Sequence, residues 1–129
     1  MTLQIEDWNS KRFGGMGCPK LKPRTRRIQG IGIHCTDGSE RLRARLGVCN
    51  WWDQPEAGGN AHQAADASGV SRYAADDRSA WHASKANEWS LGLELCGKLQ
   101  TRDQWLDELS SGGLRNGAIA AAIWCARCT

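Results

Sequence analysis

Two short segments of this chain share a pattern that is typical of β-strands. In Ile28 to Cys35 apolar residues alternate with small or polar ones, and Ser90 to Gly97 repeats the alternation. Side chains of a strand point alternately to opposite faces, so each segment has one apolar face. The other face carries glycines beside one ionisable side chain, which is His34 in the first segment and Glu94 in the second. If both strands belong to one sheet, an imidazole and a carboxyl group share a surface that glycine keeps clear.

The alternation also has a simpler explanation. His34 and Glu94 fit equally well as solvent-facing residues of an antiparallel sheet with one buried face. The pair Trp81 and His82 favours a functional surface, because it combines an aromatic wall with a titratable donor. Taken singly, His62 and His82 are more often structural histidines. All three histidines of the chain, however, fall in expected loops or on the glycine-cleared face.

Capping signals, turn residues and apolar spacing predict the other elements. In chain order these are an irregular arm over residues 1–27, a helix over about 40–52, extended segments at 61–66 and 70–74, a helix over about 101–109 and a final helix over about 114–127. Asp37 with Glu40 forms a capping-box pattern before the first helix. Thr101 with Gln104 repeats the pattern, and Gly112-Gly113 is expected to separate the last two helices. This order predicts an α/β domain with a mixed central β-sheet flanked by helices.

Length and composition narrow the class of protein. A chain of 129 residues suits one domain, and 40% hydrophobic with 24% charged residues argues against disorder. The longest nearly apolar run, over residues 117–126, is about half of the roughly 20 residues that a membrane-spanning helix needs. The first 15 residues lack the apolar core of a signal peptide. We therefore expect no membrane partner and no export signal.

Charge and cysteine spacing exclude two further classes of site. The net charge is +3, with basic clusters over residues 20–27 and 41–45. A nucleic-acid site needs interleaved aromatic residues or a known binding module, so we predict no nucleic-acid partner and assign residues 20–27 to a solvated basic surface. Six cysteines are scattered, and only Cys125 and Cys128 are closely spaced. A zinc knuckle would need a second pair of closely spaced cysteines, which this sequence lacks. We therefore expect the cysteines to be reduced thiols with a structural role.

Four motifs occur in an order that is specific to one family. They are Ile33-His34-Cys35-Thr36, Gly59-Asn60-Ala61-His62, Arg78-Ser79-Ala80-Trp81-His82-Ala83 and Asn87-Glu88-Trp89-Ser90-Leu91-Gly92-Leu93-Glu94. In order and spacing they resemble the zinc-dependent N-acetylmuramoyl-L-alanine amidases shared by phage endolysins and peptidoglycan recognition proteins. The resemblance divides the chain into a basic N-terminal arm, residues 1–27, and an amidase-like domain, residues 28–129. The segment from Trp51 to Pro55 looks most like endolysins of phages that infect actinobacteria.

The resemblance implies an activity and a set of site residues. The activity is hydrolysis of the amide between N-acetylmuramic acid and the L-alanine of the stem peptide, with peptidoglycan as partner and zinc as cofactor. His34 matches the first zinc ligand of the family, and Glu94 matches a carboxylate that orients or deprotonates the zinc-bound water. The residues that match positions lining or supporting the substrate groove are Thr36, His62, Trp81, His82 and Asn87.

The family pattern is incomplete in this chain. The family adds a second His and a Cys or Asp after a helix like that over 114–127, whereas the last histidine here is His82. A catalytic zinc requires about three protein ligands, so the resemblance implies a C-terminally truncated amidase with an incomplete zinc site.

Three interpretations of the incomplete zinc site remain open. The first is a split endolysin that needs a second polypeptide for its zinc ligands. The second is a non-catalytic peptidoglycan-binding module. The third is a rebuilt site that uses the three histidines or Cys125 and Cys128. As a phage endolysin, the protein is expected in the host cytoplasm before lysis and then at the cell wall.

Overall fold

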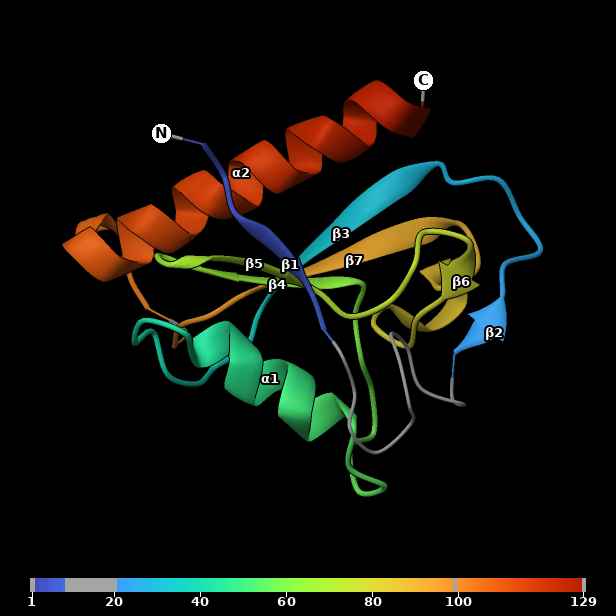
Figure 1. The fold of residues 1–129 in the computed structure, drawn as a ribbon, viewed down its shortest axis with the longest axis horizontal. Helices are drawn as coiled ribbons and strands as arrows, with labels where there is room; N and C mark the ends of the chain where they lie inside the picture. The colour runs from blue at the N-terminus through green and yellow to red at the C-terminus, as the bar shows by residue number, and fades with distance from the viewer. Residues whose placement is uncertain (1, 9–20, 99, 129) are drawn as a thin grey trace.

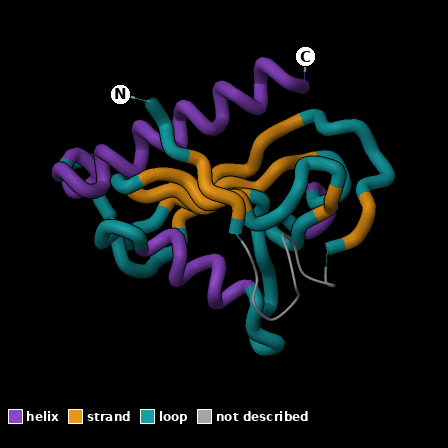
Figure 2. Tube along the Cα trace, in the orientation of Figure 1, coloured by secondary structure: helices purple, strands orange, loops and turns teal. Residues whose placement is uncertain are grey.

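A five-stranded mixed sheet forms the centre of the protein. The computed structural model describes residues 2–8, 21–98 and 100–128 (Figures 1 and 2). The strands of this sheet, in spatial order, are β1 (Ile5–Asp7), β5 (Gly69–Arg72), β4 (Gln63–Asp66), β7 (Ser90–Leu95) and β3 (Gly30–Cys35). Strands β4 and β5 pair antiparallel, and the other neighbours pair parallel. A small second sheet joins β2 (Lys22–Pro23) to β6 (Arg78–Ser79).

One α-helix covers each face of the central sheet. Helix α2 (Glu108–Cys128) crosses one face, and α1 (Ala44–Trp52) lies on the other (Figure 1). Two 3₁₀ turns, η1 (Ser84–Ala86) and η2 (Gln104–Leu106), complete the described elements. The predicted α/β fold, a mixed sheet flanked by helices, is confirmed. Neither helix in the described part of the chain has the length and hydrophobicity that crossing a membrane requires.

The helix break predicted at Gly112-Gly113 is wrong, because α2 runs without interruption through both glycines. Glycine costs a helix about 1 kcal/mol relative to alanine. Here it permits close contact with the sheet, since a Cβ on Gly112 would lie 2.7 Å from the Cβ of Ala67. A Cβ on Gly117 would lie 2.5 Å from Cδ2 of Leu95. Tertiary packing therefore overrides the local preference for a break.

The start of α1 also differs from the prediction. The helix begins at Ala44, after Arg43, whose positive φ of 66° and lack of a side-chain capping bond exclude the predicted capping box. The carboxylate of Asp66, in β4, instead accepts a hydrogen bond of 3.0 Å from the backbone N–H of Arg45. The carboxylate of Glu40 accepts a hydrogen bond from Ser110 in α2. The first turn of α1 is thus capped by the sheet rather than by its own sequence.

The capping box at Thr101 and Gln104 does form. The backbone N–H of Thr101 donates to Oε1 of Gln104 at 2.8 Å. The backbone N–H of Gln104 in turn lies 3.4 Å from Oγ1 of Thr101. The box starts only η2, however, and not a helix that extends to residue 109.

Residues 1–27 are more regular than predicted. Strand β1 adds an edge to the central sheet by pairing with β5, and β2 pairs with β6. Leu21 is buried in the apolar cluster beneath α1. The predicted irregular arm is therefore corrected at these positions, and its residues 9–20 lie outside the described part of the chain.

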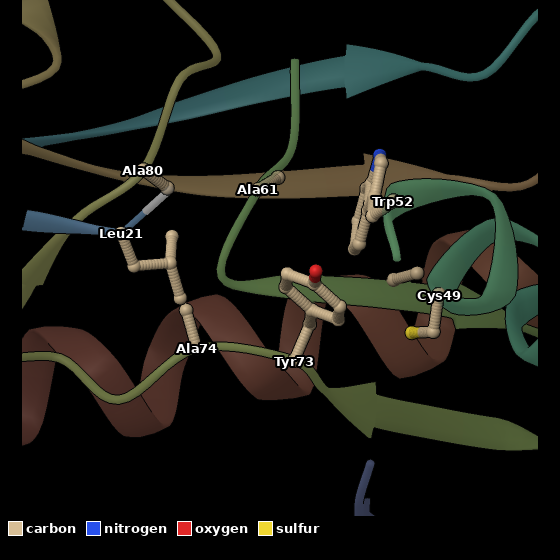
Figure 3. Packing of buried hydrophobic residues seen from close by; sticks show 8 residues of the cluster. Leu21, Cys49, Trp52, Ala61, Tyr73, Ala74 and Ala80 are labelled. Atoms are coloured by element: carbon tan, nitrogen blue, oxygen red, sulfur yellow. The ribbon is translucent and has the colours of Figure 1, made fainter. Parts of the chain in front are cut away.

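The sheet separates two apolar clusters. The cluster on the α1 side includes Trp52 and Tyr73, whose rings meet edge to face with centroids 5.1 Å apart (Figure 3). The Tyr73 hydroxyl donates to the buried Asp53 at 3.0 Å, so this aromatic residue is satisfied at its polar end. The cluster on the α2 side packs Trp124 against Leu91 and its neighbours. Together they bury both faces of the central strands.

The described cysteines are free, as expected for structural thiols. Cys49 and Cys96 are buried, and burial is the main cause that raises the pKa of the Cys96 thiol to about 12. Burial also raises the pKa of the Cys49 thiol far above its usual range. Both thiols therefore stay protonated at neutral pH.

Replacing Gly47 with alanine is expected to raise the free energy of unfolding by about 0.5–1 kcal/mol. Gly47 lies inside α1, and nothing lies within 4 Å of an added Cβ. Urea denaturation measures the effect. The matched control is Gly117→Ala in α2, which is expected to destabilise because its Cβ would meet Leu95. A stabilising effect of Gly117→Ala would contradict the packing account of α2.

Candidate active site

His34 and Glu94 lie side by side on neighbouring parallel strands. The register of β3 and β7 pairs His34 with Glu94 and Gly32 with Gly92. Paired residues of parallel strands point to the same face, and neighbouring strands lie about 4.8 Å apart. Glu94 lines a groove together with residues of α1, which places both groups on the α1 side of the sheet. The two strands are therefore arranged as their sequence pattern predicts.

The space above the two glycines is filled by a third side chain. A Cβ on Gly92 would lie 2.6 Å from Cγ of His82, and one on Gly32 would lie 3.1 Å from Cε1 of the same ring. The expected open surface is therefore corrected, because the glycines make room for an imidazole of the protein itself. His82 comes from the loop before η1 and lies across both strands.

His34 and His82 form a hydrogen-bonded pair. Nε2 of His34 lies 3.0 Å from Nδ1 of His82, and the rings meet edge to face. On its other side, Nε2 of His82 lies 3.2 Å from the hydroxyl oxygen of Ser90. Burial, with a smaller contribution from the charge of His34, lowers the pKa of His82 to about 4. His82 is therefore neutral at neutral pH.

His62 is fully buried, and both of its ring nitrogens bind backbone groups. Nδ1 accepts a hydrogen bond of 2.9 Å from the N–H of Gly92, and Nε2 lies 2.9 Å from the carbonyl oxygen of Arg78. A carbonyl only accepts, so Nε2 carries the proton. Burial lowers the pKa of His62 to about 4, which is consistent with a neutral ring. His62 joins β7 to the loop that carries His82.

Two asparagines hold the loop in place. Oδ1 of Asn87 accepts hydrogen bonds from the backbone N–H groups of His82, at 3.0 Å, and of Ala83, at 2.7 Å. Oδ1 of Asn60 accepts from the backbone N–H of Trp81 at 2.8 Å. The position of the His82 ring is thus fixed from its backbone as well as from the sheet.

A groove of about 790 Å³ opens beside this arrangement. Of the site residues expected from sequence, Thr36, Trp81, His82 and Glu94 line it, whereas His34, His62 and Asn87 are not among its lining residues in the described part of the chain. The opposite wall comes from α1 and the loop before it. That wall includes Arg41, Arg43 and Trp51. Exposed indoles and guanidinium groups suit a polar, extended ligand.

Glu94 is the carboxyl group of the groove. Its Oε2 atom is buried and has no hydrogen-bond partner among the described residues. Burial raises the pKa of Glu94 to about 7. A carboxyl group that gains and loses its proton near neutrality is suited to general acid–base chemistry. The orphaned oxygen also marks a place where a water or a ligand can bind.

The described residues do not fit a catalytic zinc site by themselves. No group of three or more His, Cys, Asp or Glu side chains that could hold a metal occurs within residues 2–8, 21–98 and 100–128. The three-histidine alternative is wrong for this part of the chain, because both nitrogens of His62 are bonded and His82 is engaged by its neighbours. Cys125 and Cys128 lie in α2, on the other face of the sheet.

Arg24 is a residue of the site that the sequence interpretation missed. Its guanidinium donates to five backbone carbonyls within residues 76–90, the segment that contains His82. These belong to Asp76, Arg78, Asn87, Glu88 and Ser90, at distances from 2.7 to 3.4 Å. Within the basic run over residues 20–27 no spacing signal separates Arg24 from its neighbours. The expected solvated surface is therefore corrected at this position.

Most of the chain matches a known protein family. Residues 24–128 match the family described as N-acetylmuramoyl-L-alanine amidase. No curated protein sequence matches the chain closely enough to count as a relative.

Three solved structures illustrate the shared fold. The structure of PlyL shares 16% identity over 93% of this chain and 70% of its own, with a TM-score of 0.64. A mutant endolysin from Bacillus subtilis shares 18% identity over 74% and 62%, with a TM-score of 0.58. The Staphylococcus aureus hydrolase AmiA, in complex with its ligand, shares 17% identity over 96% and 56%, with a TM-score of 0.67. The chain thus spans 56% to 70% of the lengths of these proteins. Because the family match covers most of the chain, including the whole candidate site, the chain belongs to the N-acetylmuramoyl-L-alanine amidase family.

Proposed function

We propose that this chain takes part in hydrolysis of the amide between N-acetylmuramic acid and L-alanine in peptidoglycan, as part of a phage endolysin. The observation that carries the proposal is Glu94, a carboxyl group with an orphaned oxygen and a pKa raised to about 7. It faces the groove beside His34 in a member of the amidase family. The proposed setting is the host cytoplasm before lysis and the cell wall afterwards.

The proposed chemical role of Glu94 is proton transfer. In its ionised form the carboxylate accepts a proton from the water whose oxygen attacks the amide carbon. It then gives that proton to the amide nitrogen as the C–N bond breaks, which returns the carboxylate to its starting form. Thr36 and Trp81 would contact the substrate from the walls of the groove. Trp81 has 51% of its surface exposed, so it is available for this contact.

We also propose zinc as the cofactor, because the resemblance to the family implies it. In this chain His34 would be one of its ligands. The described residues lack a three-ligand set, so the remaining ligands must come from outside them. We propose a second polypeptide as their source.

The experiment is a cell-wall assay that identifies the bond cleaved. Purified chain is incubated with actinobacterial walls, alone and with the product of the neighbouring reading frame, with and without a chelator. New N-terminal alanine is then quantified. We expect its release only with both polypeptides and no chelator. Release of reducing sugar instead of alanine would contradict the proposed amide specificity.

A second candidate function is a non-catalytic peptidoglycan-binding module. The absence of a three-ligand metal group among the described residues favours it. It differs from the first proposal in two outcomes of the same assay. The chain would sediment with walls in the presence of chelator, and no alanine would be released under any condition.

A further inference from the structure

Strand β3 forms one edge of the central sheet. It pairs with β7 on one side, and no described strand pairs with its other side. At its end the N–H of Thr36 donates to the carbonyl oxygen of Leu95 at 3.0 Å. Alternate residues of a strand direct their backbone groups to opposite edges, so Ile31 and Ile33 direct theirs away from β7. Within the described part of the chain, no hydrogen bond satisfies these outward groups.

This edge lacks the features that usually keep a second strand from pairing with it. Natural sheets protect an open edge with proline, with lysine or other charged side chains, or with a bulge. The segment over residues 28–35 contains no proline, lysine, arginine or acidic residue. Strand β3 also pairs with β7 residue for residue, without a bulge. The outward groups are therefore free to accept another strand.

Ile33 is an exposed apolar side chain on this edge. It pairs with Leu93, which is buried on the α2 side of the sheet, so Ile33 points to the same side. Helix α2 packs on β4, β5 and β7. Leu93 is covered by that packing, whereas 58% of the surface of Ile33 is exposed. Ile33 thus projects from the edge as an apolar group without cover.

An apolar hollow of about 190 Å³ lies next to it on the same face. Its lining includes Ile31, Leu91 and Trp124. The side chains of Ile31 and Ile33 share this face because they are two residues apart in one strand. The edge therefore carries an apolar projection and an apolar hollow side by side.

We propose that two copies of this chain associate through the free edges of β3, which pair as antiparallel strands centred on Gly32. In this register the outward backbone groups of Ile33 bond those of Ile31 in the other copy. The Ile33 side chain then packs beside the hollow next to that Ile31. Two-fold symmetry repeats the contact, so one surface is complementary to itself. The proposal does not depend on the proposed function.

The charges at the two ends of β3 favour the antiparallel direction. Arg26 and Arg27 precede the strand, Asp37 follows it, and all three are exposed. Centred on Gly32, the antiparallel register brings Arg27 of each copy to the end where Asp37 of the other copy lies. Complementary charges at the rim of an interface fix its register and suppress wrong pairings.

This association leaves the groove open. The groove lies on the α1 side of the sheet, whereas the hollow and Ile33 lie on the α2 side. The residue opposite His34 in the proposed register is Gly30 of the other copy, which has no side chain to cover it. A dimer of this kind is therefore compatible with a ligand in the groove.

The test is sedimentation velocity of the full chain between about 5 and 500 µM, a range that suits a small interface. We expect a reversible equilibrium between monomer and dimer. A chain that stays monomeric at the highest concentration would overturn the proposal.

A substitution at the edge tests which surface is used. Ile33→Lys places a charge on the free edge and should weaken dimerisation by about tenfold or more. The matched control is Leu106→Lys in η2, since Leu106 is also 58% exposed. Dimerisation should be unchanged in this control. Equal effects of the two substitutions would contradict an interface at β3.

A charge exchange tests the register. Arg27→Glu should weaken dimerisation several-fold, and adding Asp37→Lys in the same chain should restore it, because the two charges are then exchanged across the interface. Weakening without restoration would overturn the antiparallel register.

Amide hydrogen exchange at Ile31 and Ile33 gives a readout of strand pairing itself. Their N–H groups should exchange more slowly as the protein concentration rises, and Ile33→Lys should remove this dependence at Ile31. A dimer without such protection would overturn the proposal. So would protection that appears only with the product of the neighbouring reading frame, because the edge would then bind a different chain. None of these measurements needs metal or activity, so their failure leaves the proposed function untouched.

Discussion

Replacing Glu94 with glutamine is expected to reduce alanine release by the reconstituted enzyme about 10²- to 10⁴-fold. Glutamine keeps the size and hydrogen-bonding shape of the side chain but cannot accept the proton from the attacking water. The rate is measured as new N-terminal alanine from purified walls. The matched control is Glu56→Gln, which changes an exposed carboxylate in the loop after α1 and should leave the rate unchanged.

The same substitution is expected to have the opposite effect on stability. The pKa of Glu94 is raised to about 7 in the folded chain, above its usual value of 4.5. The folded state therefore holds a proton that the unfolded state has lost, and stability falls as the pH rises from about 4.5 through about 7. Glutamine carries no charge and removes this loss.

Denaturation of metal-free protein at pH 5 and pH 8 tests this sign. The wild type should lose more stability than Glu94→Gln between the two pH values, whereas Glu56→Gln should follow the wild type. Retained activity in Glu94→Gln would remove Glu94 from its proposed role. A Glu94→Gln protein that is less stable than the wild type at pH 8 would instead contradict the burial of an unpaired carboxyl group.

The core of the site could be predicted because it follows from a strand period of two. Alternation alone places His34 and Glu94 opposite apolar residues, and parallel pairing of the two strands then brings them together. The glycines beside them also indicated a close approach, as glycine in a strand often does. What approaches them is decided by a loop distant in sequence. His82 lies 48 residues after His34, and no local pattern indicates that its ring fills the space.

The errors in the helices have a similar origin. Gly112-Gly113 would end a helix in isolation, but the turn between β4 and β5 packs so closely beneath α2 that it leaves no room for a Cβ at Gly112. The start of α1 depends on Asp66, which lies in β4 and satisfies the N–H of Arg45. In both places a partner far along the chain outweighs the local signal, which is a general limit of propensity as a predictor.

Replacing Arg24 with alanine is expected to lower the free energy of unfolding by about 2–4 kcal/mol. Five backbone carbonyls of residues 76–90 accept hydrogen bonds from its guanidinium. Bonds from a charged donor contribute more than neutral ones, and several of these acceptors are partly buried. Removing the guanidinium takes a donor from all five, although the carbonyls of Arg78 and Asn87 keep a second donor in His62 and Ser79.

Lysine at position 24 is expected to recover less than half of this loss. Its ammonium keeps the charge but donates from one atom, and cannot reach carbonyls that a planar guanidinium contacts through three nitrogens. Urea denaturation gives the free energies. Amide hydrogen exchange at His82 and Ser90 should also become faster in Arg24→Ala, because the arginine ties the loop that carries His82 to the strand that carries Ser90.

The control for Arg24 is Arg26, an exposed arginine of the same basic run. Arg26→Ala is expected to change stability by less than about 0.5 kcal/mol, as surface substitutions usually do. Equal effects at the two positions would restore the interpretation of residues 20–27 as a uniform solvated surface. A large effect at Arg24 alone would mean that this arginine is part of the framework that holds His34 and His82. The number of basic residues in the run, by itself, would then have wrongly assigned Arg24 to the solvated surface.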